Sequence, residues 1–357
     1  MRKTRGPAAL GIVGDELMLR EGPMPRATVW PCHMLGRRVL RAAAKKASKK
    51  SAAKEKRSAE AAATRKTLVR ISVKMTPLDH LKSAVSITVI TLNLAIWVLL
   101  LVVLGSAKFL LPPFRGGIDS LLALVYRTAV RINDLWLRGV MGISWDRPEA
   151  GVAKDEVCIV LSNHASWSDI LILQSVISLD GPLLKFLSKR ELVFIPIFGV
   201  IFWAFDFPAL RRGAKGTVDE ATRRRMDAEA LDAACDAVRE HPAAMMVFAE
   251  GTRFSEEKRE SMSSPYRTLL PPRVGGLASI REALAEDADI LLDVTLAYPE
   301  EASFWLFLSG RLKTVGVVID RIPLETVPSS REGLIPWLSD RWQRKAARIE
   351  VVRGGTR

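Results

Sequence analysis

VCIVLSNHASWSDILILQSVIS, residues 157–178, decides the fold, because an apolar run passes through a polar loop into a helical pattern. The run from Val157 to Ser162 is typical of a buried strand, and a helix is expected over residues 169–178 with Ser168 as its N-cap. Further strands are expected at 245–249, 290–298 and 312–320, and further helices at 217–240, 274–286 and 336–349. This alternation predicts an α/β fold with a largely buried sheet.

The polar loop of this stretch contains a histidine and, five residues later, a carboxylate. His164 falls in the loop and Asp169 in the first helical turn, so the chain can bring the carboxylate to one imidazole nitrogen. The other nitrogen would then be free to act as a general base. Such a pair needs no nucleophile from the protein if the substrate brings a hydroxyl. The spacing alone is a weak signal, because a lone loop histidine is more often structural.

A second polar turn, Phe248-Ala-Glu-Gly-Thr-Arg253, also follows an apolar strand. Gly251 allows close approach of the backbone, and the planar guanidinium of Arg253 suits a phosphate or a carboxylate. Glu250 would either hold Arg253 or bind a substrate hydroxyl. The plain alternative is a turn with an ordinary ion pair.

Together the two motifs, NHxxxxD and FxEGTR, resemble those of the glycerolipid acyltransferases of the lysophosphatidic acid acyltransferase type. Two further blocks agree with that family, LSKRELVFIPIFGVIFWAFDFPALRR at 187–212 and VTLAYP at 294–299. The resemblance spans residues 75 to about 345 and implies a mixed sheet flanked by helices, preceded by an apolar membrane helix or hairpin. It also implies transfer of a fatty acyl group from acyl-CoA or acyl carrier protein to the free hydroxyl of a lysophospholipid. Lysophosphatidic acid is the first expectation for the acceptor, and another lysophospholipid such as lysophosphatidylinositol is the alternative.

The resemblance also implies roles for individual residues. His164 is the general base and Asp169 orients it, while Arg253 holds the acceptor phosphate. The other expected binding residues are Asn163, Lys189, Glu250, Gly251 and Thr252, with Asn163 supporting the loop and Lys189 near the phosphate or the oxyanion. The chain departs from the family at Phe205-Asp206-Phe207-Pro208, where an Ile-Asp-Arg is usual, and basic residues follow only at Arg211 and Arg212. No metal or other cofactor is expected, because the motif has no second His or Cys at ligand spacing.

An uncharged apolar segment from Ser83 to Ala107 precedes these motifs and is long enough to cross a hydrocarbon core as a helix. A buried core helix is the alternative. Pro112-Pro113 is expected to stop this helix and Gly116-Gly117 to extend the break. Residues 118–142 then predict a basic amphipathic helix, which lies in the headgroup layer or packs on the domain. Its expected apolar side contains Leu121, Leu124, Val125, Ala129, Ile132, Leu135 and Trp136.

The positive charge of the chain is confined to its beginning. Residues 1–74 carry 19 basic and 5 acidic side chains, whereas the remainder has 34 of each. We therefore expect a disordered basic low-complexity tail at 1–74, membrane-anchoring helices at 75–142 and an acyltransferase domain at 143–357. Nucleic acid is not an expected partner, because the expected domain is electrically balanced. Met75 opens a plausible start of its own, so residues 1–74 are also compatible with an over-extended gene model.

Membrane topology sets one constraint on these expectations. A basic tail favours an inside N-terminus, and a complete crossing would then place the site outside, away from thioester donors. We therefore expect a half-buried hairpin and a site facing the cytoplasm, at the inner membrane if the source is bacterial. A membrane-anchored lipid-binding module with a degenerate site is the alternative function. A serine hydrolase is disfavoured, because no G-x-S-x-G lies near the histidine.

Overall fold

The computed structural model describes residues 75–207, 209–210 and 220–354. The expected tail at 1–74 and the basic residues Arg211 and Arg212 lie outside the described residues. The described strands form a six-stranded mixed sheet in the order β1-β8-β7-β2-β6-β3. The strands are β1 Ser144–Trp145, β2 Cys158–Ser162, β3 Leu183–Phe186, β6 Ala243–Phe248, β7 Ile290–Ala297 and β8 Thr314–Pro323. A separate pair consists of β4 Ser188–Lys189 and β5 Ala209–Leu210.

The middle of the sheet is parallel, and its edge is not. β2 pairs in parallel with both β6 and β7, and β3 pairs in parallel with β6. β8 runs antiparallel to β7, and the short β1 pairs with β8 in parallel. Every residue of β2 is buried, because helices cover both faces of the central strands. The expected mixed sheet flanked by helices is therefore confirmed.

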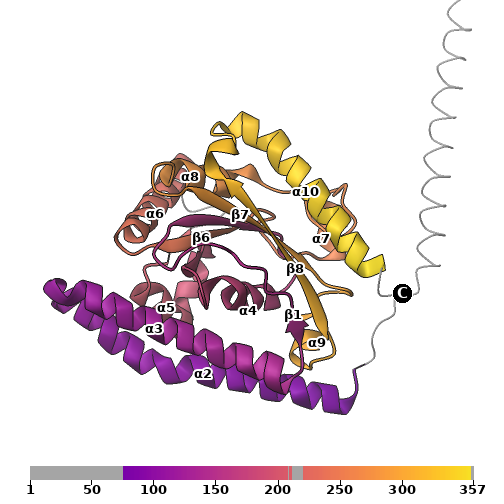
Figure 1. Cartoon of the computed structure of the whole chain (residues 1–357), viewed down its shortest axis with the longest axis horizontal. Coiled ribbons are helices and arrows are strands. Elements are labelled where there is room, and N and C mark those ends of the chain that lie inside the picture. Colours follow the sequence, from indigo (N-terminus) through magenta and orange to yellow (C-terminus); the bar gives the residue numbers. More distant parts are fainter. Residues whose placement is uncertain (1–74, 208, 211–219, 355–357) are drawn as a thin grey trace, which may run out of the picture. The chain divides into compact units, whose positions relative to one another are not determined.

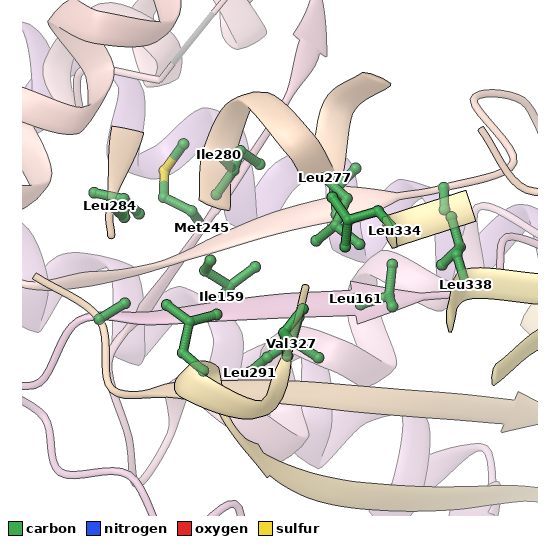
Figure 2. Packing of buried hydrophobic residues seen from close by; sticks show 14 of the residues in the cluster. Ile159, Leu161, Met245, Leu277, Ile280, Leu284, Leu291, Val327, Leu334 and Leu338 are labelled. Carbon is green, nitrogen blue, oxygen red and sulfur yellow. The ribbon is translucent and has the colours of Figure 1, made fainter. Parts of the chain in front are cut away.

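Three helices cover one face of the sheet: α6 Glu220–Glu240, α8 Val274–Ala283 and α10 Arg331–Gly354 (Figure 1). Their apolar residues pack onto alternate residues of β2, as Figure 2 shows for Ile159 and Leu161 against Leu277, Ile280 and Leu334. Such a core stabilises the sheet by about 1.5–3 kcal/mol for each large side chain that is fully buried. It also holds the ends of the central strands at fixed positions.

The other face is covered by α4 Ser168–Leu173, α5 Pro196–Ala204 and the pair α2 Pro77–Leu110 and α3 Arg115–Asp134 (Figure 1). Helix α4 continues as a π-helical turn, Gln174–Ser178, and α3 continues as another, Leu135–Val140. The shorter helices are α7 Glu256–Ser261 and α9 Phe304–Leu308. The 3₁₀ turns are Pro112–Phe114, Arg190–Phe194 and Leu324–Thr326.

The long helix α2 begins at a capping box, in which the Thr76 hydroxyl accepts from the Asp79 amide and the Asp79 carboxylate accepts from the Thr76 amide. It ends at Leu110, just before Pro112-Pro113, as expected from the missing proline donors. The expectation that Gly116-Gly117 extends the break is wrong. Helix α3 already begins at Arg115 and includes both glycines, because the 3₁₀ turn at the prolines is enough to reverse the chain.

Helix α2 is held by the rest of the chain along its whole length. Near its start, the Ser83 hydroxyl donates to the Trp305 carbonyl at 2.8 Å. In its middle, the Asn93 amide donates to Asn133 Oδ1 at 2.9 Å. Near its end, Gly105 lies so close to Trp203 of α5 that a Cβ would come within 2.5 Å of the indole ring. The pair α2 and α3 is therefore fixed to the domain rather than tethered to it.

Much of the surface of α2 and α3 is apolar and exposed. Among the described helices, α2 alone is long and apolar enough to cross a membrane, and only 17% of its most apolar 18-residue window is buried. The alternative of a buried core helix is therefore wrong. Helix α3 differs from its expected pattern, because it is apolar on two sides. One side packs on α2 and the domain, and the other exposes Leu121, Leu124 and Ile132, followed by the exposed Leu135 of the π-helical turn.

Candidate active site

The two sequence motifs meet at the carboxyl ends of the parallel strands. Ser162, the last residue of β2, pairs with Phe248 of β6 and with Val294 of β7. The loops that follow β2 and β6 therefore leave the sheet side by side, where α/β folds commonly place reactive groups. A backbone hydrogen bond of 2.8 Å from Phe254 to the His164 carbonyl joins the loops directly.

His164 and Asp169 form the expected pair. Nδ1 of His164 lies 2.9 Å from Oδ2 of Asp169, and the same oxygen accepts from the amides of Ala165 and Ser166 at 2.7 and 2.9 Å. A carboxylate that already accepts two amides can only accept from the ring as well, so Nδ1 carries the proton. Nε2 is thereby left with a lone pair. Asp169 is fully buried, whereas the His164 side chain is partly exposed.

The expectation that Ser168 caps the following helix is wrong. Trp167 occupies the N-cap position with helical backbone angles, and Ser168 is already the first residue of α4. The loop amides are satisfied by Asp169, so the Ser168 hydroxyl is free to pair with the Tyr298 hydroxyl at 2.8 Å.

Tyr298 is a site residue that the motif analysis did not assign. Its hydroxyl donates to Oδ1 of Asp169 at 2.6 Å, and the side chain is buried. Burial, and then the Asp169 charge, raise the pKa of the Tyr298 hydroxyl well above 10, so it remains a donor. The one sequence signal for it is its position at the end of the VTLAYP block.

An aromatic side chain fixes the plane of the imidazole. The rings of His164 and Phe248 stack with centroids 3.8 Å apart and an interplanar angle of 12°. Phe186 of β3 continues the stack behind Phe248 at 6.2 Å. The stack restricts rotation of His164, and the hydrogen bond to Asp169 sets which edge of the ring is presented.

Glu250 lies behind the site rather than in it. Its side chain is fully buried, and its two oxygens accept from the amides of His164 and Leu270 at 3.2 and 3.1 Å. Burial raises the pKa of the Glu250 carboxyl to about 8. The described residues show no ion pair between Glu250 and Arg253. The contacts of Glu250 instead hold the His164 loop against the segment before α8.

The rest of the second motif forms a cationic turn beside the imidazole loop. Gly251 has a φ of 69°, which glycine adopts without steric cost. The Arg253 guanidinium lies over the Trp167 ring, 4.6 Å from its centroid. The Lys258 ammonium donates to the Thr252 hydroxyl at 2.8 Å and to the Arg253 carbonyl at 3.0 Å. Lys258 was not expected, because it lies on α7 beyond the motif.

Asn163 and Lys189 complete the expected set. The Asn163 side chain pairs with the backbone of Leu296 like a strand residue, donating to its carbonyl at 3.0 Å and accepting from its amide at 2.9 Å. It therefore joins the His164 loop to β7. Lys189 lies in β4, and its side chain lies outside the described part of the chain.

The comparisons with known proteins concern the family of the chain. The acyltransferase family matches residues 148–299, and the acyltransferase C-terminus family matches residues 306–351. Together the two spans cover more than half of the chain. Residues 148–299 thus form a domain of the acyltransferase family, and the relatives that the chain matches are named as acyltransferases of lysophospholipids.

Three curated relatives illustrate the similarity. The chain is 27% identical over 214 residues to lysocardiolipin acyltransferase 1 of Gallus gallus, covering 56% of this chain and 54% of that protein. It is 27% identical over 255 residues to 1-acyl-sn-glycerol-3-phosphate acyltransferase 3 of Arabidopsis thaliana, covering 66% and 64%. It is 29% identical over 216 residues to 1-acyl-sn-glycerol-3-phosphate acyltransferase delta of Homo sapiens, covering 56% of this chain and 54% of that protein. The matches thus span between about half and two thirds of these relatives.

A solved structure is also similar, the 1-acyl-sn-glycerophosphate (LPA) acyltransferase PlsC from Thermotoga maritima. The identity is 18%, the match covers 73% of this chain and 95% of that chain, and the TM-score is 0.37.

Proposed function

We propose that the chain transfers a fatty acyl group from a thioester, acyl-CoA or acyl carrier protein, to the free hydroxyl of a lysophospholipid, with lysophosphatidic acid as the first candidate. The observation that carries the proposal is the 2.9 Å contact of His164 Nδ1 with Asp169, which leaves Nε2 available as a base. The family membership supports the reaction class, and the relatives' names support the acceptor class.

The reaction needs one proton acceptor and a carbonyl held in place. Nε2 of His164 takes the proton of the acceptor hydroxyl as the oxygen attacks the thioester carbonyl carbon. The tetrahedral oxyanion collapses, the carbon–sulfur bond breaks, and the leaving thiolate takes the proton back from Nε2. Asp169 stabilises the imidazolium between these steps, and Tyr298 holds Asp169.

The cationic turn is the proposed place for the acceptor phosphate. Arg253 is exposed and, among the described residues, forms no ion pair, so its guanidinium is available beside the His164 loop. Gly251 and Thr252 shape this turn, and Lys258 adds a second positive charge. We also propose that Lys189 lies near the phosphate or the oxyanion, because it belongs to the sequence block that resembles the family.

Asn163 and Glu250 are assigned to the support of this site. Both side chains bind backbone groups of neighbouring segments, so their effect on the reaction passes through the position of His164. Their proposed contribution to substrate binding is therefore indirect, whereas the sequence motifs placed both among the substrate-binding residues.

The membrane association of the family fits the exposed apolar surface of α2 and α3. Because α2 is held by the domain near its start and near its end, and by α3 in its middle, we propose that the pair lies in one leaflet as a half-buried hairpin. The site would then face the cytoplasm, at the inner membrane in a bacterium. The same proposal divides the chain into a tail at 1–74, anchoring helices at 75–142 and the acyltransferase domain at 143–357.

An acyl-transfer assay on membrane-reconstituted protein tests the function. Both thioester donors are paired with lysophosphatidic acid, lysophosphatidylinositol and monolysocardiolipin. His164→Ala is expected to remove nearly all turnover without loss of membrane binding. The control is His80→Ala, which replaces an exposed histidine on α2 and is expected to retain turnover. Substantial transfer by His164→Ala would overturn the base assignment. Wild-type protein that binds lysolipid but transfers from neither donor would favour the lipid-binding module.

A further inference from the structure

A pocket of about 330 Å³ lies at the opposite end of the sheet from His164. Leu183 and Ala243, the first residues of the parallel strands β3 and β6, form part of its wall. The imidazole loop follows the other ends of these parallel strands, so the pocket is separate from the acyl-transfer site. The remaining walls come from the end of α2, the start of α3 and the turn after α5.

A buried lysine without a partner lines this pocket. Lys185 of β3 is 5% exposed, and within the described residues it has no hydrogen bond and no ion pair. Burial lowers the pKa of its ammonium to about 8. An unpaired buried charge costs stability, so its presence in a hollow indicates a partner that enters from outside.

The acidic groups of the pocket are already paired. The Lys108 ammonium bridges Asp119 and Asp206 at 2.9 and 2.5 Å, and His241 also contacts Asp119, at 2.7 Å. Both carboxylates are near enough to favour the charged form of Lys185, but neither forms an ion pair with it among the described residues.

Three further charged groups complete the charge balance of the pocket. Lys154 and Asp155 are both exposed, and their charges offset each other. Arg127 donates only to the Gly181 carbonyl, at 3.2 Å, and has no carboxylate partner among the described residues. The pocket is lined by four cationic side chains, Lys108, Arg127, Lys154 and Lys185, and by three carboxylates, Asp119, Asp155 and Asp206. Burial lowers the pKa of His241, which is therefore neutral. One positive charge is left over, and it favours an anion.

The position of the pocket indicates the source of that anion. Lys108 and Gly116, which line it, flank the turn between α2 and α3. That turn exposes Phe109, Leu110 and Phe114 by 81, 71 and 66%. If this apolar tip enters a leaflet, the pocket lies at the depth of the lipid phosphates.

We propose that this pocket binds a phosphate group, supplied by the headgroup of an anionic phospholipid, at a site distinct from the site of acyl transfer. The lipid source rests on the membrane docking proposed above, whereas the phosphate chemistry rests on Lys185 and Arg127. Free phosphate offers the same chemistry, and the two sources are separated by the choice of probe.

Binding to the full-length protein in neutral detergent tests the proposal by titration calorimetry. One probe is dihexanoyl-phosphatidylglycerol, a short-chain anionic lipid, and the other is inorganic phosphate. Lys185→Met is expected to raise the Kd at least about tenfold, because a charge-assisted hydrogen bond is lost. Lys313→Met removes the same charge from an exposed lysine outside the pocket and is expected to leave the Kd unchanged.

A second measurement protects against a folding defect. Without ligand, Lys185→Met is expected to melt at a higher temperature than the wild type, because an unpaired buried charge is replaced by an apolar side chain of similar length. Lys185→Arg is expected to restore binding in part. Performing the titrations also in the His164→Ala background separates this site from acyl transfer, since binding there should persist without turnover.

The outcomes divide clearly. Tighter binding of the lipid probe than of inorganic phosphate supports the headgroup as the source, and the reverse order assigns the site to a soluble phosphate. Absence of binding of both probes to the wild type, or an unchanged Kd in Lys185→Met, would overturn the proposal.

Discussion

The Tyr298 hydroxyl donates to Oδ1 of Asp169 at 2.6 Å, while Oδ2 of the same carboxylate contacts His164 at 2.9 Å. The carboxylate proposed to orient the base is therefore held by the residue that directly follows β7, more than a hundred residues further along the chain. Tyr298 acts through Asp169, as a positioning residue for the proposed reaction.

Tyr298→Phe is expected to lower kcat by about 10-fold or more, because a hydrogen bond to a charged group contributes about 1.5–3 kcal/mol. With one donor fewer, Asp169 attracts the imidazolium proton more strongly, so the acid limb of the pH–rate profile should move to higher pH. Tyr266→Phe removes a hydroxyl that bonds to the Ser339 carbonyl and serves as the control. An unchanged rate and profile in Tyr298→Phe would contradict this role.

Glu250 predicts a pH dependence of stability. Its carboxyl has a pKa of about 8 in the folded chain, against 4.5 for an unperturbed carboxyl. Between these values the folded state binds more protons than the unfolded state, so stability should fall as pH rises through this window. The slope is at most about 1.4 kcal/mol per pH unit. Chemical denaturation at a series of pH values measures it.

Glu250→Gln should flatten that slope, because the amide does not titrate. It should also lower stability at pH 5 by about 1–3 kcal/mol, since its NH₂ group faces one of the two backbone amides that Glu250 now accepts from. A slope equal to that of the wild type would assign the pH dependence to another group.

Buried charges fasten α10 to the sheet. Lys345 is fully buried and lies 2.5 Å from Oδ1 of Asp293 on β7, and it also donates to the Val294 carbonyl. Lys345→Ala leaves a buried carboxylate short of one partner and should cost about 3–5 kcal/mol of unfolding free energy.

Arg344→Ala, one residue away, breaks only an exposed pair with Asp340 and should cost under about 1 kcal/mol. Denaturant melts of the two variants make the comparison. Equal losses would show that helix propensity, not the buried pair, accounts for the effect.

The close packing of α2 on α5 gives a prediction about Gly105. Gly105→Ala should destabilise the chain by about 1–3 kcal/mol, because the new Cβ would lie within 2.5 Å of the Trp203 ring. Gly117→Ala on α3 meets nothing within 4 Å and should stabilise by about 0.4–1 kcal/mol. Thermal melts in detergent distinguish them, and a stabilised Gly105→Ala would show that Trp203 moves aside freely.

The sequence was most informative where the signal is local. Apolar runs predicted β2, β6 and β7 within two residues at their ends, because a buried parallel strand excludes polar side chains. The spacing of His164 and Asp169 was enough to place the carboxylate on the ring, since both residues lie on one turn of chain.

Other features depend on strand register and packing, which no local pattern contains. Tyr298 reaches Asp169 because β7 pairs with β2, and Lys185 has no ion pair while the nearby acids are bound by Lys108. The sequence also left open whether the apolar side of α3 meets lipid or protein, for a related reason. Both of its sides are apolar, and hydropathy alone does not tell a protein neighbour from lipid.

Both ends of α2 contact the domain, so the helix and the domain cannot rotate relative to each other. On a bilayer, such a protein would sit at one fixed depth. The height of His164 above the lipid would then be a constant of the fold, and a lysolipid would have to rise by that same distance at every turnover.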